Sequence, residues 1–137
     1  MSKNTSFIVD TNIFLRFLTN DIEKQAKRVE KRFLEAEKGT IELRILLITV
    51  VEILFHLERW YKYPKIKAIE MVENLFGREW MMVDEKDVLF SALGEYKKTT
   101  IDFVDLLTFY QAKMDERMIL SFDKDYDKLS PSLRVEP

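Results

Sequence analysis

The stretch FIVDTNIFLRFL, residues 7–18, places an acid between two apolar patterns of different period. Phe7, Ile8 and Val9 form a short apolar run of the kind that fills buried strands, and the run ends at Asp10. A pattern with helical spacing begins directly after it. We therefore expect a strand that delivers the carboxylate of Asp10 to one edge of a sheet, with a helix leaving at once.

The rest of the chain alternates in the same way between short apolar runs and helical patterns. We expect further strands near residues 43–48, 80–83 and 117–123, and helices over 20–39, 49–61, 64–77, 86–98 and 102–114. Asn20 and Glu23 resemble a capping box at the start of the first of these helices, and Gly39 is placed to end it. The alternation predicts an α/β domain with a central parallel sheet and helices on both of its faces.

Length and composition limit the possible classes of protein. A chain of 137 residues favours one domain, residues 1–137, and 47% hydrophobic with 34% charged residues indicates a folded chain. The net charge of −2 argues mildly against a pure nucleic-acid-binding module. No cysteine is present, which excludes disulfides, thiol nucleophiles and zinc–thiolate sites. The polar start MSKNTS predicts no signal peptide, no apolar run is long enough to cross a bilayer, and we expect a cytoplasmic protein.

Four acids are placed to meet at one edge of the predicted sheet. Asp123 ends an apolar run just as Asp10 does, while Glu52 and Asp105 come early in helices. The carboxyl ends of parallel strands, and the helices that follow them, meet at the same sheet edge. Clustered carboxylates repel one another, and a hard cation such as Mg²⁺ or Mn²⁺ relieves that repulsion. Such a cation can polarise a phosphate and activate water for phosphodiester hydrolysis.

The same stretches resemble the four signature blocks of PIN-domain ribonucleases, most closely the toxin component of VapBC-type toxin–antitoxin systems. The blocks are IVDTNIFLRFLTND, the isolated glutamate in TVVEIL, IDFVDLLTFYQA and ILSFDKDY, in the family's order over nearly the whole chain. The resemblance implies a single PIN domain, a three-layer α/β/α sandwich around a central parallel sheet. It also implies endoribonuclease activity with Mg²⁺ or Mn²⁺, an RNA substrate and a possible antitoxin partner.

Carried over residue by residue, the resemblance assigns catalysis and metal binding to Asp10, Glu52, Asp105 and Asp123. Asn12 and Ser121 match the family's supporting polar positions beside the first and fourth acids. The family often has threonine where this chain has Ser121, and a small residue in place of Phe109 or Tyr110. Together with the apolar aromatics Trp60 and Tyr61 near a predicted helix end, the resemblance also leads us to expect a homodimer.

Each acid also has a purely structural interpretation. Asp10 could cap a helix, and Asp123 could be an ordinary turn acid. Asp105, like Asp102, is a first-turn residue favoured by the helix dipole, and Asp102 could be the N-cap. Thr49 and Glu52 have the spacing of a capping box, which on local evidence is the better explanation of Glu52. These interpretations together require four coincidences in register with a known pattern, so we favour the joint, functional interpretation.

Several other assignments are weaker. A phosphatase of the haloacid-dehalogenase type wants a second aspartate where this chain has Asn12, and the paired acids of a phosphorelay receiver domain are missing. A catalytically silent PIN-like module that binds RNA or protein stays open as the alternative. Arg16 could contact a substrate phosphate or pair with Asp21. The basic residues of 24–31 are interleaved with glutamates and are interpreted as a solvated helix face.

Overall fold

The computed structural model describes residues 5–137, and the chain forms two compact units, Met1–Lys86 and Asp87–Pro137. The expectation of one domain over residues 1–137 stays a prediction. The polar start on which the absence of a signal peptide was predicted lies partly at residues 1–4, outside the described part. Between residues 5 and 137 no helix is both long enough and apolar enough to cross a membrane.

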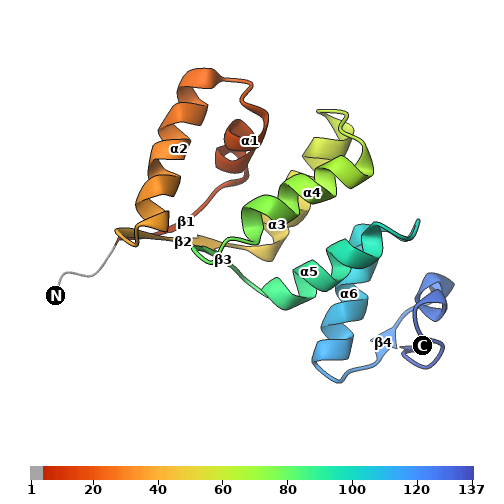
Figure 1. Ribbon diagram of the computed structural model, residues 1–137. Helices are drawn as coiled ribbons and strands as arrows, with labels where there is room; N and C mark the ends of the chain where they lie inside the picture. The colour runs from red at the N-terminus through yellow and green to blue at the C-terminus, as the bar shows by residue number, and fades with distance from the viewer. Residues whose placement is uncertain (1–4) are drawn as a thin grey trace. The chain divides into compact units, whose positions relative to one another are not determined.

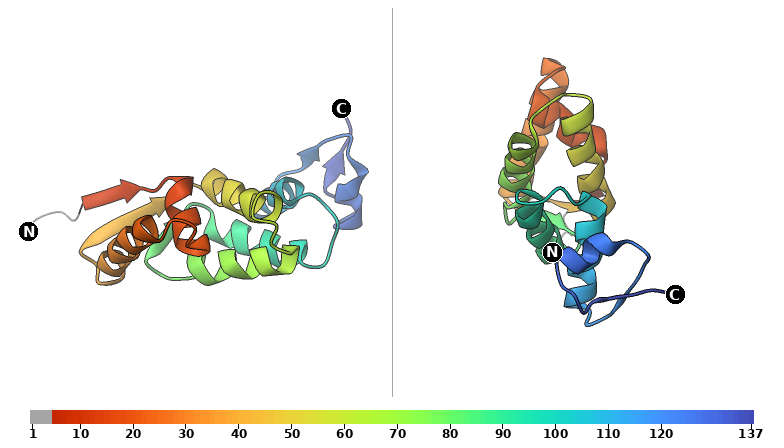
Figure 2. Two further views of the ribbon diagram at one scale, coloured as in Figure 1. Left: turned by 90° about the horizontal axis from the view of Figure 1, so that it is seen from above. Right: turned by 90° about the vertical axis from the view of Figure 1, so that its right-hand side faces the viewer.

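The first unit contains a parallel sheet of three strands in the order β1-β2-β3 with four α-helices (Figure 1). Its elements are β1 Thr5–Ile8, α1 Thr11–Thr19, α2 Glu23–Glu37, β2 Ile41–Ile45, α3 Leu47–Arg59, α4 Lys65–Phe76 and β3 Met81–Val83. Neighbouring strands are joined through helices, as parallel pairing requires. Figure 2 shows β1 and β2 side by side. In their parallel register Thr5 lies opposite Ile41, and Ile8 lies opposite Arg44.

The second strand is shorter than predicted and is buried on one face only. Ile41, Leu43 and Ile45 are buried, and Glu42 and Arg44 between them are exposed, which is the period-two alternation of a half-buried strand. The predicted strand near residues 43–48 is wrong at its end, because α3 already begins at Leu47. The run ILLI is apolar throughout, so its composition does not mark the change from period two to period 3.6.

The first strand also differs from the expectation of a buried strand. All four residues of β1 are exposed to some degree, and Ile8 reaches 64% exposure. In its sheet β1 pairs with β2 alone, so it has the environment of an edge strand. Val9, which follows the strand, is the buried residue of the run. Asp10 therefore comes two residues after the strand instead of ending it.

Asn20 ends one helix and does not begin the next, so the predicted capping box is wrong. It has a left-handed φ of 53° and its backbone N–H donates to the Arg16 carbonyl, which makes it the C-cap of α1. Asparagine tolerates this conformation better than most residues do. Ile22 takes the N-cap position of α2. Gly39, with a φ of 82°, follows the C-cap of α2 as predicted.

The core of the first unit is built around aromatic side chains from its helices. Phe14 of α1 is fully buried and its ring centroid lies 4.9 Å from that of Phe76 and 5.9 Å from that of Phe33. Phe33 also lies 5.8 Å from Trp80, just before β3. Ring pairs at such distances add about 0.5–1.5 kcal/mol beyond area burial. This cluster fixes α1 and α2, and with them the segment after Asp10.

The second unit contains two α-helices, a 3-10 helix and two short parallel strands. They are α5 Lys86–Tyr96, α6 Phe103–Met114, β4 Ile119–Leu120, η1 Lys124–Lys128 and β5 Arg134–Val135. Phe109, Ala112, Ile119 and Tyr126 form its buried cluster. The helices over 86–98 and 102–114 were predicted, whereas η1 and β5 were not. Parallel strands with intervening helices confirm the predicted α/β class.

Candidate active site

Asp10 occupies the N-cap position of α1, yet it does not act as a cap. Its backbone has the extended conformation typical of that position, with φ −79° and ψ 154°. No capping hydrogen bond from its side chain occurs in the described part of the chain. The carboxylate is exposed, so the capping interpretation does not explain why an acid stands here.

Glu52 lies well inside α3, which removes its capping-box interpretation. The helix begins at Leu47, so Glu52 is the sixth helical residue and not the third that a capping box requires. Thr49, the expected cap of that box, is buried within the first turn. The Oγ1 of Thr11 donates a hydrogen bond of 2.8 Å to Oε2 of Glu52. Since Thr11 follows Asp10 directly, this bond ties the second acid to the segment that carries the first.

Asp105 lies in an environment that disfavours its negative charge. It is the third residue of α6, half-buried, and the Tyr126 hydroxyl donates to its Oδ1 over 3.3 Å. Burial raises the pKa of Asp105 above its ordinary value, and the negative charges of Asp123, Asp102 and Asp125 raise it further. The hydrogen bond from Tyr126 acts in the opposite direction. Asp105 therefore lies among other carboxylates, as an oxygen-ligand metal site requires.

Asp102, the other acid of the block IDFVDLLTFYQA, stands at the N-cap position of α6 and is exposed. Within residues 5–137 its side chain makes no capping hydrogen bond either. Its negative charge contributes to the raised pKa of Asp105. Asp105, with its greater burial and its hydrogen bond, is the better placed of the two.

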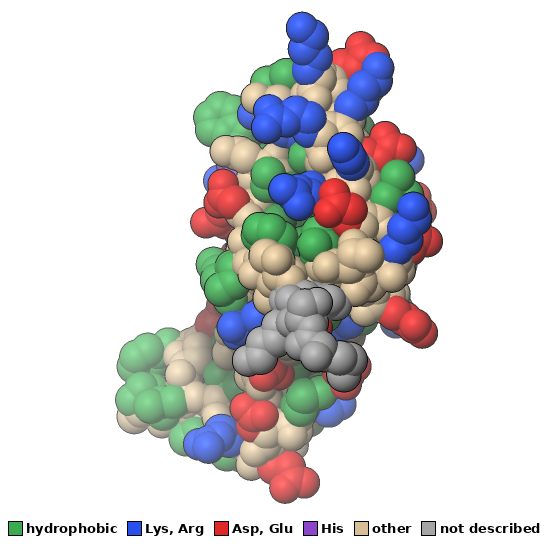
Figure 3. Space-filling view, turned by 90° about the vertical axis from the view of Figure 1, so that its left-hand side faces the viewer, with side chains coloured by type: hydrophobic (Ala, Val, Ile, Leu, Met, Phe, Trp, Pro, Cys, Tyr) green, Lys and Arg blue, Asp and Glu red, His purple; other side chains and the backbone are tan. Residues whose placement is uncertain are grey.

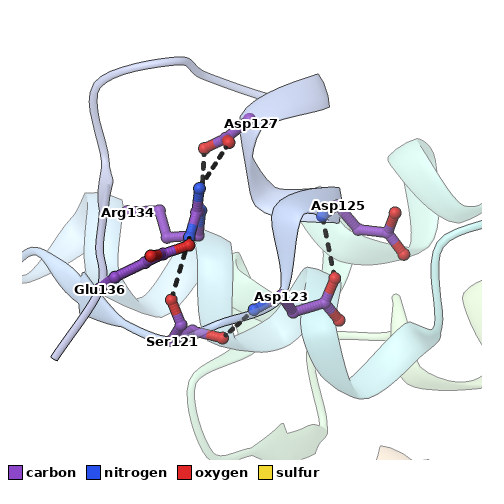
Figure 4. A network of polar contacts seen from close by, with 6 residues as sticks. All are labelled: Ser121, Asp123, Asp125, Asp127, Arg134 and Glu136. Carbon is purple, nitrogen blue, oxygen red and sulfur yellow. Dashed lines mark hydrogen bonds and ion pairs between the residues drawn. The ribbon is translucent and has the colours of Figure 1, made fainter.

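Asp123 is held in a network of polar contacts at the end of β4 (Figure 4). Its Oδ1 accepts a 2.9 Å hydrogen bond from the backbone N–H of Asp125, which caps η1 and uses one carboxylate oxygen. Its own backbone N–H donates to the hydroxyl of Ser121 over 2.9 Å. The turn-acid interpretation of Asp123 is thus realised, together with a supporting contact from Ser121.

An arginine fixes the other side of this loop. Arg134 on β5 makes a bidentate ion pair with Asp127, and it also contacts Glu136 and the Ser121 carbonyl (Figure 4). The bidentate pair lowers the pKa of Asp127 and raises that of the guanidinium. Such planar pairs restrict both partners. Ser121 thus accepts hydrogen bonds from Arg134 at its carbonyl and from the backbone N–H of Asp123 at its hydroxyl.

Asn12 was predicted to support the site, and three further residues contact the predicted site residues or the loop that holds them. Asn12 is exposed on α1 and lines a hollow between α1 and α2. Sequence reasoning gave no role to Thr11, Tyr126 or Arg134, whose contacts with Glu52, Asp105 and the loop are long-range in sequence. An aromatic residue inside the acidic run FDKDYDK was the one available signal for Tyr126.

The structure thus shows two pairs of acids, one pair in each unit. Thr11 ties Glu52 to the segment of Asp10 in the first, and Asp105 and Asp123 interact electrostatically in the second. Over the described residues, no group of three Asp, Glu, His or Cys side chains by itself forms a metal-binding cluster. The union of the two pairs into one four-acid site, and the pairing of the strands that precede Asp10 and Asp123, stay predictions.

Parallel strands joined through helices define an α/β protein, and Asp10 and Asp123 each follow one of its strands. The chain belongs to the PIN domain family, whose sequence model matches residues 7–130. That match includes all four acids, and it confirms the predicted PIN-like fold, a three-layer α/β/α sandwich. A VapC ribonuclease of Aquifex aeolicus (strain VF5) is 28% identical over 123 residues, which cover 89% of this chain and 90% of that relative.

Proposed function

We propose that this protein is a metal-dependent endoribonuclease of the VapC toxin kind, with Mg²⁺ or Mn²⁺ as its cofactor. The observation that carries the proposal is the presence of Asp10, Glu52, Asp105 and Asp123 within the matched PIN region. The similarity to a VapC ribonuclease supports RNA as the substrate. Nothing in the four positions has been replaced, in contrast to a catalytically silent module, in which one or more acids are typically lost.

The donor set fits a hard divalent cation. Four carboxylates supply oxygen ligands only, which Mg²⁺ and Mn²⁺ prefer, and Asp105 already experiences repulsion from neighbouring acids. When bound, such a cation polarises a phosphate and lowers the pKa of water. Thr11 orients the Glu52 carboxylate, Tyr126 orients that of Asp105, and Ser121 fixes the backbone of Asp123. The first two contacts restrict the acids before any ligand arrives.

We expect the purified protein to cleave single-stranded or structured RNA with Mg²⁺ or Mn²⁺ present and to be inactive in EDTA. The reason is that the four acids serve as ligands of a cation that activates water, and the chain, with one histidine and no cysteine, offers no set of such side chains for another mechanism. A cleavage time course on labelled RNA with and without EDTA measures this. Undiminished cleavage in EDTA would reject the metal-dependent mechanism, and no cleavage with either ion would favour the silent RNA- or protein-binding module.

The proposal extends to partners and location. We propose a cytoplasmic homodimer restrained by an antitoxin segment that brings a basic side chain to the acids and displaces the cation. The exposed Trp60, at 76% of its possible accessible surface, supports an apolar contact at the end of α3. Light scattering at high concentration should give twice the mass of the chain, and Trp60→Ser should lower it. A monomer at every concentration would remove the dimer from the proposal.

A further inference from the structure

A hollow of about 700 Å³ lies between α1 and α2 in the first unit. Its lining includes the apolar residues Ile13 and Val29, and Asn12, which comes two residues after Asp10. The volume is within the range of small-ligand sites. The hollow therefore lies next to the segment that carries the first acid.

The walls of the hollow are strongly basic. Arg16, Arg28, Lys31 and Arg32 line it, and Glu35 is the single acid among its lining residues. This local excess of positive charge occurs in a chain whose net charge is −2. Figure 3 shows Lys and Arg side chains, with Asp and Glu side chains between them, on the side of the first unit where α2 lies. A concentrated positive field of this kind attracts polyanions.

Two of the four cations are engaged by neighbours, and two are not. Arg16 pairs with Asp21 at 3.2 Å and donates to Gln25, while Arg32 lies 3.4 Å from Glu35 and over the Phe7 ring. In the described part of the chain no ion pair joins Arg28 or Lys31 to a carboxylate. Their charges are therefore available to a ligand.

The geometry distinguishes this surface from the solvated helix face predicted from the sequence. Lys27 pairs with Glu23 at 3.3 Å, and neither Lys24 nor Lys27 lines the hollow. On α2, Arg28 and Lys31 thus line the hollow, whereas Lys24 and Lys27 lie outside it. Residues three or four positions apart on a helix lie roughly 5–6 Å from one another, which is close to the separation of successive phosphates in a nucleic-acid strand.

We propose that this hollow binds the phosphate backbone of single-stranded RNA, with Arg28 and Lys31 as the principal phosphate contacts. The inference rests on the proposed ribonuclease function and adds to it a substrate-holding site. A nucleic-acid strand carries one negative charge at every nucleotide. This regular charge spacing suits closely spaced cations better than the irregular charges of most polypeptides do. The apolar side chains of Ile13 and Val29 accept a sugar or base edge. An RNA strand that also contacts Asn12 lies next to the segment that carries Asp10.

The test measures binding of a fluorescein-labelled single-stranded RNA to the full chain in EDTA, by anisotropy, at several salt concentrations. The variant Arg28→Gln with Lys31→Gln removes two charges and keeps helix-forming residues. We expect its affinity to fall by about 20-fold at ~0.1 M salt, and the slope of log affinity against log salt to decrease by roughly 1.4. The control, Lys24→Gln with Lys27→Gln, removes the same charge from the same helix and should change both quantities little.

Equal weakening by the two double variants would show an effect of net charge alone and would overturn the proposal, as would no weakening by either. Stronger binding of a poly-glutamate peptide than of RNA, at matched charge, would assign the hollow to an acidic polypeptide and reject RNA. Because binding is measured without metal, its outcome is separate from that of the cleavage assay. A hollow that binds RNA in a protein that does not cut leaves this inference standing and removes the catalytic proposal.

Discussion

Replacing Glu52 with glutamine is expected to lower the rate of RNA cleavage by about 10²-fold or more, with the fold intact. Glutamine keeps the size of the side chain and offers a carbonyl oxygen that still accepts the hydrogen bond from Thr11. It replaces a charged ligand by a neutral one, which a hard cation binds far less well. Glu52→Gln therefore keeps the hydrogen bond with Thr11 and removes the negative charge that would bind the metal. Single-turnover cleavage with Mn²⁺ measures the rate.

The matched control is Glu70→Gln, the same substitution at an exposed position of α4. Both variants should give the circular dichroism spectrum and the urea midpoint of the parent, because surface substitutions usually stay within about 0.5 kcal/mol. The control should also cut RNA at the parental rate. If Glu52→Gln does so too, Glu52 has no part in catalysis, and the four-acid site is wrong.

Binding of Mn²⁺ should raise the free energy of unfolding by about 2.7 kcal/mol when the free ion is at ~100 times its dissociation constant. In the proposed four-acid site the ion binds the folded state alone, because the unfolded chain offers no comparable site. Thermal melts over a wide Mn²⁺ titration measure the effect. A melting temperature that does not change with Mn²⁺ concentration throughout the titration would count against a formed acidic site.

Asp105→Asn should behave in opposite ways with and without the ion. In EDTA the variant should be at least as stable as the parent at neutral pH, since the folded-state pKa of Asp105 is raised and its ionisation opposes folding. The sign follows from linkage: the parent loses stability as pH rises from 3.8 through the raised pKa of the folded state, and the variant lacks that loss. Addition of Mn²⁺ should raise the free energy of unfolding of the variant much less than that of the parent. Urea melts from pH 3 to pH 7 check the first statement.

The chain itself determined which residues could form the site and what kind of fold would carry them. An apolar run, an acid and a helical pattern in immediate succession identified Asp10, and Asp123 also ends an apolar run. These are local signals, because a strand and the residue that follows it are fixed by neighbouring side chains. The helix bracketed by Pro64 and Gly77, observed as Lys65–Phe76, was predictable for the same reason.

Only the tertiary structure decided how the acids are held. The capping-box pattern of Thr49 and Glu52 is as good as any in the sequence, and it is wrong because α3 begins two residues before Thr49. Glu52 is bound instead by Thr11, 41 residues away, and Asp105 by Tyr126, 21 residues away. No local pattern encodes such pairs, because they depend on which helix faces are packed together.

The same division applies to the basic surface of α2. Its composition, with acids and bases interleaved, suggested an ordinary solvated helix face. The packing of α1 against α2 places Arg28 and Lys31 along a hollow and leaves Lys27 outside it, paired with Glu23. A sequence gives the order of charges along the helix. The neighbour on one side of that helix decides which of those charges face a cavity and which face water, since burial and pairing are properties of the packed structure.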